Sequence, residues 1–199
     1  MNWIKRILNP PGPLSDRDLL RALKRGEIVL DPPVKPDRQI QPASIDLRLG
    51  HSFHMISDTG NPTQVLNYYG EFRILPGQFV LATTIERVRL ADDLLGVLAG
   101  RSSVGRAGVQ VENAGVVDPG WDGQLTLELC NQGKEVVALY PGMRIVQMVV
   151  YRLTSPAVRP YGHPERKSKY QGQRGATPSK LALEIAESVY GKAGTRSRG

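Results

Sequence analysis

Cysteine is nearly absent from this sequence, since Cys130 is the only one among 199 residues. No disulfide can form within the chain, which excludes a disulfide-stabilised scaffold. Zinc-dependent nucleobase deaminases need a His or Cys followed by Pro-Cys-x-x-Cys, which one cysteine cannot supply. Cys130 falls in an alternating strand pattern, so we expect a buried and inert thiol there.

Histidine is also scarce, with His51, His54 and His163 scattered along the chain. None of the three stands at a metal-ligand spacing with the cysteine. We expect surface or structural roles for these histidines, and no metal site built from protein side chains.

Long apolar runs are missing as well. No stretch approaches the roughly 20 residues of a membrane-spanning helix. The first residues lack the apolar segment and the small-residue cleavage site of a signal peptide, so we expect a soluble cytoplasmic protein. The sequence also lacks a Walker loop and the glycine pattern of dinucleotide-binding folds, which excludes those two kinds of nucleotide site.

The composition is otherwise that of a globular protein, with 40% hydrophobic and 23% charged residues. A chain of 199 residues can bury a full core as a single domain. The formal net charge is +7, and residues 159–199 carry nine Lys or Arg against three Asp or Glu, a net charge of +6. Most of the net positive charge therefore lies in the last 41 residues. Nucleic acid, a membrane surface and substrate phosphates are all suitable partners for such a basic segment, and charge alone does not decide among them.

One helix is predicted near the start of the chain. Ser15 stands in the N-cap position before residues 16–25, which have acidic residues in the first turn, basic residues in the last and Gly26 directly after. Elsewhere, short alternating or apolar runs are separated by Gly and Pro. The predicted strands cover residues 28–31, 41–50, 73–90, 94–100, 125–130 and 136–153. This pattern predicts a mainly β fold, a barrel or distorted jelly roll with an N-terminal helix and short peripheral helices.

Two of these strand regions carry more detailed expectations. The strand over 41–50 alternates, with apolar residues on one face and Asp46 and Arg48 on the other, where we expect an ion pair or polar network. Its final residue, Gly50, is expected to terminate it. Residues 73–90 are expected to form a strand, a Pro-Gly turn and two further strands.

The chain divides into four parts by composition. Residues 1–13 are an N-terminal appendage, 14–160 a β domain, 161–180 a C-terminal tail and 181–199 an extension. The tail is polar, basic and rich in glycine, and we expect it to need a partner to order it. The extension begins with a run, 181–190, that can form a closing helix.

Serine and arginine residues gather directly after the strand 94–100. Arg101, Ser102, Ser103 and Arg106 follow a glycine there, so amide, hydroxyl and guanidinium groups could converge on phosphate oxygens as charge-assisted donors. The alternative is a solvated turn with a surface ion pair, and these residues alone do not decide between the two.

Two acidic residues are candidates for chemistry. Asp118 lies in a Val-Val-Asp-Pro-Gly run, where it could cap a turn or bind substrate. Glu128 shares a strand face with Thr126, whereas the neighbouring leucines point to the opposite face. A glutamate in so apolar a strand must be paired or have a raised pKa suited to proton transfer, and the pattern favours proton transfer.

Taken in order, these motifs resemble the dCTP deaminase branch of the dUTPase superfamily over about residues 14–179. The motifs are weak one by one, but their order and spacing are specific. They are residues 15–19 (Ser-Asp-Arg-Asp-Leu), 41–50 (Gln-Pro-Ala-Ser-Ile-Asp-Leu-Arg-Leu-Gly), 100–106 (Gly-Arg-Ser-Ser-Val-Gly-Arg), 113–121 (Asn-Ala-Gly-Val-Val-Asp-Pro-Gly-Trp), 125–128 (Leu-Thr-Leu-Glu) and 168–175 (Ser-Lys-Tyr-Gln-Gly-Gln-Arg-Gly).

The resemblance implies a homotrimer of distorted jelly-roll subunits with active sites shared between subunits, no zinc, and magnesium that accompanies the nucleotide triphosphate. It implies that Glu128 is the general acid and base for attack of water at C4 of cytosine. Ser102 and Arg106 would position that water and the glutamate, and Asp118 would bind the region of the deoxyribose 3′-hydroxyl. The other residues implied to bind base, sugar or triphosphate are Arg101, Ser103, Val104, Gly105, Thr126, Leu127, Gln147, Tyr161, Lys169 and Gln173.

One branch of this family also hydrolyses the nucleotide to dUMP and diphosphate in the same site. The aspartate that matches Asp118 would activate a second water in that step. The segment 109–117 contains Asn-Ala-Gly and no histidine, as in that branch, and the run 169–175 resembles it too. Val116 departs from the branch, which tends to have an aromatic residue there. We therefore expect deamination of dCTP to dUTP and ammonia, and leave open the further step to dUMP.

Two other functions stay open. A dUTP diphosphatase without deamination is similar over residues 114–118, but it has no need of a carboxylate at Glu128. A basic nucleic-acid-binding barrel would use the tail, which lacks stacking aromatic residues beyond Tyr161 and Tyr170. We expect a small nucleotide as the partner, and neither nucleic acid nor a membrane.

Overall fold

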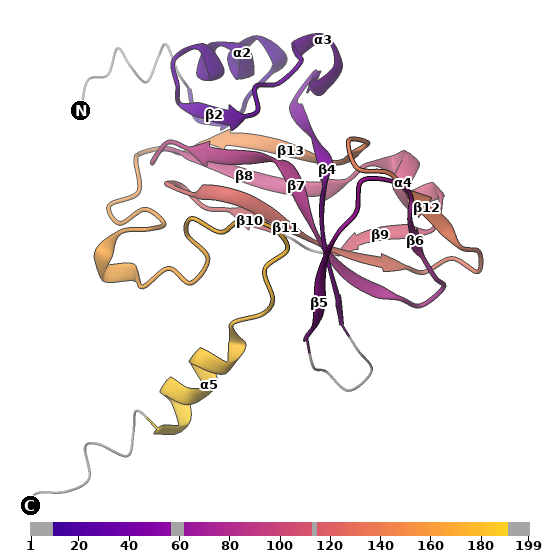
Figure 1. The fold of residues 1–199 in the computed structure, drawn as a ribbon. Helices are drawn as coiled ribbons and strands as arrows, with labels where there is room; N and C mark the ends of the chain where they lie inside the picture. The colour runs from indigo at the N-terminus through magenta and orange to yellow at the C-terminus, as the bar shows by residue number, and fades with distance from the viewer. Residues whose placement is uncertain (1–9, 57–61, 113–114, 191–199) are drawn as a thin grey trace, which may run out of the picture.

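The computed structural model describes residues 10–56, 62–112 and 115–190, and it consists mainly of short antiparallel strands joined by turns (Figure 1). The strands are β1 (Gly12–Pro13), β2 (Ile28–Asp31), β3 (Ile40–Gln41), β4 (Ser44–Ile56), β5 (Pro62–Asn67), β6 (Phe72–Ile74), β7 (Phe79–Leu90), β8 (Leu94–Gly100), β9 (Val109–Glu112), β10 (Val116–Val117), β11 (Asp122–Asn131), β12 (Val137–Leu139) and β13 (Arg144–Arg152). The helices are α2 (Asp16–Lys24), α3 (Pro36–Gln39), α4 (Ser102–Arg106), the 3-10 helix η1 (Pro164–Arg166) and α5 (Leu181–Tyr190).

Most strands belong to one curled sheet with the order β10-β8-β13-β4-β7-β11-β9. The 13-residue strand β4 pairs with β13 through its first half and with β7 mainly through its second half, so it passes from one side of the curl to the other. The two sides enclose one apolar core with side chains from β4, β7, β11 and β13. The predicted mainly β fold with an N-terminal helix and short peripheral helices is confirmed.

Gly50 does not end its strand, so that prediction was wrong. It lies inside β4, where a Cβ atom would stand 2.7 Å from Thr83 Cγ2 and 3.0 Å from the Thr83 carbonyl oxygen. The pairing of β4 with β7 shifts its register between Leu49 and Phe53, across this point. Because glycine in a strand interior permits such a close backbone approach, the strand continues to Ile56.

The region after the turn at Pro76 and Gly77 forms one long strand, where the sequence predicted two. The run Val80 to Thr84 in β7 is buried at every position. This strand is paired with β4 on one side and with β11 on the other, and side chains are covered on both of its faces. A strand buried on both faces loses the simple polar and apolar alternation, which is why its pattern appeared divided.

The polar face of β4 forms the expected network, although Asp46 and Arg48 pair with other elements and not with each other. Glu86 on β7 is fully buried and accepts hydrogen bonds from Arg48 Nε at 2.6 Å, from the Arg48 amide at 2.9 Å and from Gln39 Nε2 at 2.9 Å. Asp46 Oδ2 accepts from Arg144 Nη1 at 3.0 Å. The network therefore ties β4 to β7, β13 and α3.

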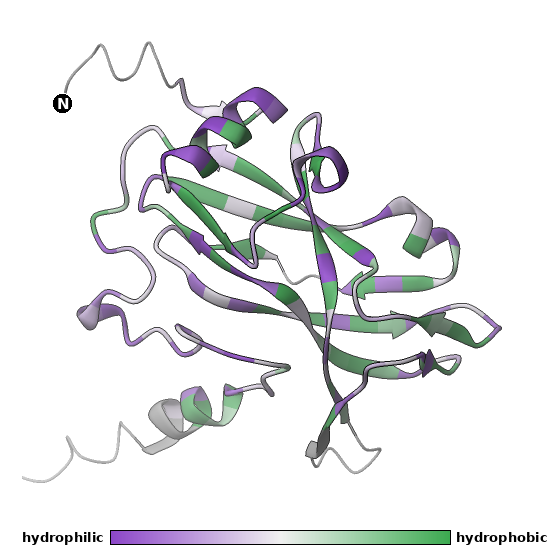
Figure 2. Cartoon of the chain, turned by 45° about the horizontal axis from the view of Figure 1, so that its top comes forward, coloured by the Kyte–Doolittle hydropathy of each residue, from purple (hydrophilic) through white to green (hydrophobic). Residues whose placement is uncertain are grey.

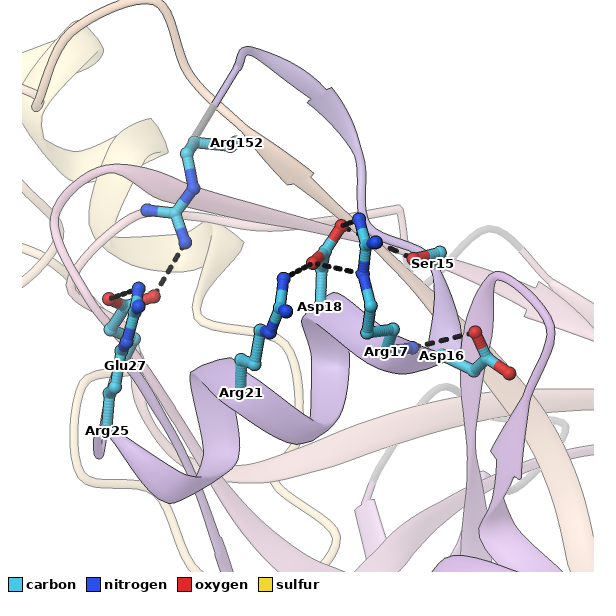
Figure 3. A network of polar contacts seen from close by, with 8 residues as sticks. All are labelled: Ser15, Asp16, Arg17, Asp18, Arg21, Arg25, Glu27 and Arg152. Carbon is cyan, nitrogen blue, oxygen red and sulfur yellow. Dashed lines mark hydrogen bonds and ion pairs between the residues drawn. The ribbon is translucent and has the colours of Figure 1, made fainter. Parts of the chain in front are cut away.

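Helix α2 begins after Ser15, as predicted, although the Ser15 side chain does not cap a backbone amide. Its hydroxyl instead donates to Asp18 Oδ2 at 3.3 Å, and Arg21 donates to the other oxygen at 3.1 Å. Figure 3 shows these contacts and, beyond the helix, Glu27 facing Arg152 of β13. The helix and the strand that follows it are therefore anchored to the sheet.

The sheet also reaches into the predicted N-terminal appendage. Gly12 and Pro13 pair with Arg152 and Tyr151 at the end of β13. The rest of the appendage, residues 1–9, and the end of the extension, residues 191–199, lie outside the described residues.

The tail, residues 161–180, is held against its own chain. The Gln124 amide donates to the Gln173 carbonyl at 3.1 Å, and the Gly175 amide donates to Gln124 Oε1 at 2.8 Å. The Ala176 amide donates to Ser52 Oγ at 3.1 Å, and the Ala176 side chain is buried. Figure 2 shows this mostly hydrophilic segment beside the sheet. The partner that we expected the tail to need is thus provided, at least in part, by β11 and β4.

Helix α5 is the helix predicted over 181–190, but it does not close the fold. It projects from the body of the molecule (Figure 1), and Leu181, Leu183 and Ile185 are each more than half exposed. Glu184 forms an ion pair with Lys169 of the tail. None of the helices among the described residues is long and apolar enough to cross a membrane.

Candidate active site

A cavity of about 690 Å³ lies between the outer face of the sheet and the C-terminal tail. Its floor comes from β4, β7 and β11, because alternate residues of these strands point away from the core. In β11 the leucines at 125, 127 and 129 are buried, whereas Thr126 and Glu128 point to the other side and line the cavity, which Leu125 also reaches at one edge. The predicted division of this strand into two faces is confirmed.

Four residues form one row across the sheet, and three of them lie on the cavity floor. His54 of β4 is paired in register with Leu81 of β7, Leu81 with Glu128 of β11, and Glu128 with Glu112 of β9. Residues directly opposite in antiparallel strands project to the same face. The row therefore places a histidine, an apolar residue and the Glu128 carboxyl side by side on the floor, and Glu112 continues the row beyond the cavity lining.

The surroundings of Glu128 favour its protonated form. Burial raises the pKa of the Glu128 carboxyl, and the negative charge of Glu112 raises it further. Among the described residues, none donates a hydrogen bond to this carboxyl or forms an ion pair with it. A carboxyl group with a pKa closer to neutrality can both accept and release a proton, which is what acid–base catalysis requires.

The opposite part of the lining is more polar. Asp118 is exposed there, and the Tyr161 ring packs 5.3 Å from that of Trp121. The Tyr161 hydroxyl accepts a hydrogen bond from the Tyr170 amide at 3.0 Å, and burial raises the pKa of Tyr161. Lys169 is half-buried, and its hydrogen bond to a carboxylate of α5 raises its pKa. This part can hold a sugar and a negatively charged group.

Six of the residues implied by the resemblance line this one cavity: Asp118, Thr126, Glu128, Tyr161, Lys169 and Gln173. Gln173 is tied to the strand below, since its Nε2 donates to the Gln124 carbonyl at 2.8 Å and to Thr126 Oγ1 at 3.3 Å. The Leu127 side chain belongs to the core, which leaves only its backbone for a substrate.

The other implied residues gather around α4, outside this cavity. Arg101 Nε pairs with Asp46 Oδ2 at 3.3 Å, and Gln147 of β13 lies opposite Asp46 in register. Ser102, Ser103 and Arg106 are exposed. The Val104 side chain is buried in the core, and Gly105 faces open space. The surface ion pair that the sequence allowed is thus partly present, and it involves a buried aspartate.

One side chain differs from its sequence prediction, and for another the structure decides between two expected roles. Cys130 stands on the same face as Glu128 and is half-buried, so the prediction of a buried thiol was wrong. His54 is 3% exposed and lines the cavity, so of the surface and structural roles expected for the histidines the surface role is excluded for it. The signal that could have revealed His54 is the polar phase of β4, which continues beyond Gly50 through Ser52 to His54.

Sequence reasoning also missed several cavity residues that carry no charge. The apolar wall includes Phe79, Leu81 and Leu98, and the tail contributes Thr177, Pro178 and Ser179. Nothing in the local pattern marks these residues, because their position depends on how the tail crosses the sheet. Among the described residues, no group of three or more His, Cys, Asp or Glu is placed to hold a metal ion. The Asn113–Ala114 part of the loop that bears on the dUMP question lies outside the part of the chain that the structure describes.

The fold is thus a curled antiparallel sheet, and it carries a cavity under a basic tail with the half-buried Glu128 carboxyl on the cavity floor. The family model described as dCTP deaminase-like matches residues 13–153. The chain belongs to the dCTP deaminase-like family.

Individual relatives agree with this assignment. The chain is 50% identical over 184 residues to a dCTP deaminase of Haloarcula marismortui, an alignment that covers 84% of this chain and 94% of the relative. It is 45% identical over 183 residues to a dUMP-forming dCTP deaminase of Methanothermobacter thermautotrophicus, with 84% and 93% covered. The fold is similar to the crystal structure of a 2'-deoxycytidine 5'-triphosphate deaminase from Agrobacterium tumefaciens, with a TM-score of 0.62 and 20% identity. That match covers 72% of this chain and 49% of the longer Agrobacterium chain.

Proposed function

We propose that this chain deaminates dCTP to dUTP and ammonia, with Glu128 as the general acid and base. The observation that carries the proposal is the half-buried Glu128 carboxyl on the cavity floor of a chain that belongs to the dCTP deaminase-like family. Relatives named dCTP deaminase are aligned over most of the chain and support the same activity.

The proposed chemistry is a hydrolysis at C4 of the cytosine ring. The Glu128 carboxylate removes a proton from water as the water oxygen bonds to C4 and the π electrons of the C4–N3 bond move to N3. The protonated carboxyl then gives that proton to the amino group, the bond from C4 to this group breaks as the electrons return from N3, and ammonia leaves. Transfer of the remaining hydroxyl proton to N3 gives the uracil ring. Because burial and Glu112 raise the pKa of Glu128, its carboxylate is a stronger base toward the water than an ordinary glutamate would be.

A second step is proposed for the same cavity. Asp118 is exposed and lines the cavity away from the row that contains Glu128, so its carboxylate is available to a water molecule near the α-phosphate. Attack by that water would split dUTP into dUMP and diphosphate. The relative from Methanothermobacter thermautotrophicus is named dUMP-forming, which supports this step here.

We further propose that the complete site forms between subunits of a homotrimer. Ser102 and Arg106 are exposed on α4 and outside the Glu128 cavity of their own chain. A neighbouring subunit could place its own serine and arginine against that cavity, where they would orient the water and the carboxyl group.

Magnesium fits this proposal as a companion of the triphosphate. Magnesium is usually held by one or two carboxylates together with substrate phosphates. The described residues form no group of three or more His, Cys, Asp or Glu that could hold a metal ion, so the ion would be held by the triphosphate. When bound, the ion would neutralise phosphate charge beside Lys169, while the contacts to base and sugar would come from the protein.

The test is a product-resolved assay with dCTP and magnesium. Ammonia with dUTP supports deamination alone, and ammonia with dUMP and diphosphate supports both steps. Turnover of dUTP without turnover of dCTP would instead establish the diphosphatase alternative. For the second step, the Asp118→Asn variant should lose diphosphate release to a greater extent than ammonia release.

A further inference from the structure

The Glu128 cavity contains a second buried polar side chain, which the proposed chemistry does not use. His54 is 3% exposed, and neither Nδ1 nor Nε2 has a hydrogen-bond partner among the described residues. Leaving a buried polar group unpartnered is costly, and nearly all such groups in folded proteins are satisfied by protein or by ordered water. We therefore expect the ring nitrogens of His54 to hydrogen-bond to water or to a ligand in the cavity.

The other polar groups near His54 already have partners. Ser52 Oγ accepts from the Ala176 amide at 3.1 Å. Thr126 Oγ1 accepts from Gln173 Nε2 and from the Thr177 amide, each at 3.3 Å. The Glu128 carboxyl differs from these hydroxyl groups, because no described residue hydrogen-bonds to it. Two unpartnered polar groups thus share one cavity floor.

The sheet fixes the separation of these two groups. His54 and Glu128 occupy the same row, with Leu81 of β7 between them. Since neighbouring strands lie about 4.8 Å apart, their Cα atoms are roughly 10 Å apart, and both side chains project to the same side. The Leu81 side chain can form a hydrogen bond with neither His54 nor Glu128. Side chains of this length can lean over Leu81 until a single water molecule reaches both, with hydrogen bonds of about 2.8 Å.

We propose that His54 is a positioning residue for Glu128, acting through a water molecule held above Leu81. A neutral imidazole offers one donor and one acceptor, so it can orient that water toward either the carboxylate or the protonated carboxyl. The bridge fixes the Glu128 side chain on the side opposite Glu112, and it selects the oxygen that exchanges the proton. This inference rests on the proposed role of Glu128 in deamination.

The kinetic test compares variants of the full chain. His54→Phe keeps a planar ring and removes both nitrogens, and His54→Gln keeps a hydrogen-bonding group. The matched control is His51→Phe on the same strand, whose parent Nδ1 lies 3.0 Å from the Tyr68 carbonyl and which does not line the cavity. We expect kcat for ammonia release to fall about 10- to 100-fold in His54→Phe, the effect of losing a hydrogen bond to a charged group. KM for dCTP should stay nearly constant, His54→Gln should recover part of the rate, and His51→Phe should match the wild type.

Two kinetic results would overturn the proposal. An unchanged kcat in a folded His54→Phe variant would show that Glu128 does not need the imidazole. A raised KM with unchanged kcat would show that His54 contacts the substrate and not the carboxyl group.

A spectroscopic readout covers the case in which His54→Phe does not fold. The chain has three histidines, so their ring nitrogens can be assigned by nitrogen-15 NMR in the substrate-free protein. Glu128→Gln should move the signals of His54 and leave those of His163 in place, whereas unchanged His54 signals would contradict the bridge. This comparison is independent of turnover. A wild-type chain that releases no ammonia from dCTP would refute the proposed function and leave the coupling of His54 to Glu128 decidable.

Discussion

At the scale of single residues, Glu128 is distinguished by having another carboxyl group directly opposite it. Burial is the larger cause of its raised pKa and Glu112 the second. The Glu112→Gln variant removes a negative charge and so lowers the pKa of Glu128 toward its ordinary value. Since the carboxylate form begins the proposed reaction, the acid limb of the kcat profile should move to lower pH.

The measurement for that variant is the rate of ammonia release from dCTP across the acid range. Glu135→Gln serves as the control, because Glu135 is exposed and outside the cavity lining, and its profile should equal the wild type. An acid limb that stays in place in Glu112→Gln, or moves to higher pH, would contradict the proposed influence of Glu112.

The buried carboxylate on β7 should matter for stability. Glu86 is fully buried and accepts three hydrogen bonds from Arg48 and Gln39. Glu86→Ala leaves the arginine without its partner, which costs about 3–5 kcal/mol for buried pairs. Urea unfolding should show this loss, whereas Glu165→Gln, which breaks an exposed pair with Arg159, should leave the midpoint nearly unchanged. Equal midpoints for the two variants would contradict the structural role of Glu86.

Individual site residues could be predicted best where the alternation of polar and apolar residues shows which face of a strand each side chain lies on. Glu128 was found because a charged residue interrupts an alternating apolar strand. His54 was missed because the strand was expected to end at Gly50, so its phase was not followed further. The close approach of Thr83 that makes Gly50 necessary is a contact between distant segments, and local spacing does not contain it.

At the scale of elements, the tail and α5 should differ in importance. The cavity lining ends at Ser179, before α5 begins. A chain shortened to residues 1–180 should therefore keep its rate of ammonia release within about threefold of the full chain, since changes at the surface and away from the cavity have small effects. A chain shortened to residues 1–170 loses Gln173 and Ala176, whose hydrogen bonds hold the tail against the sheet, and it should lose deamination.

The two truncations are compared by kcat and KM for dCTP, with circular dichroism as a check on folding. Full activity in the chain of residues 1–170 would mean that the tail does not complete the site. Lost activity in the chain of residues 1–180 would show that α5 contributes to the site through its ion pair with Lys169, although α5 does not line the cavity.

Elements were predictable to the extent that their limits are local. Helix α2 was located from its end residues, and most strands from the Gly and Pro turns between them. β7 was divided in two because burial on both faces hides its periodicity. The tail was read as lacking order of its own, since its contacts with Gln124 and Ser52 join segments far apart in the chain.

At the scale of the whole molecule, the proposal of shared sites can be tested by mixing inactive subunits. Glu128→Gln lacks the acid–base group, and Arg106→Ala lacks a residue on α4. If a site takes Glu128 from one subunit and Arg106 from its neighbour, random trimers from an equal mixture should regain about a quarter of wild-type activity. Sites built within one chain would give no recovery after unfolding and refolding the mixture together, and that result would contradict the trimer proposal.

The fold class and the six residues in the cavity could be predicted from the sequence, because ordered motifs and strand phase carry that information. The separation of the α4 residues from the cavity could not. Leu98 of β8 lines the cavity, but α4 begins after the far end of that strand, at Ser102, and local spacing does not show that this end lies outside the cavity. In the proposed trimer the two groups would meet through contacts between copies of the chain, and a single-chain pattern does not record such contacts.

The central claim is that Glu128 deaminates dCTP, and the most direct measurement is ammonia release from dCTP by the wild-type chain and by Glu128→Gln. We predict one ammonia for each uracil nucleotide formed by the wild type, and no detectable release by the variant, which should still bind nucleotide. Absence of ammonia from the wild type, or equal release by the variant, would contradict the claim.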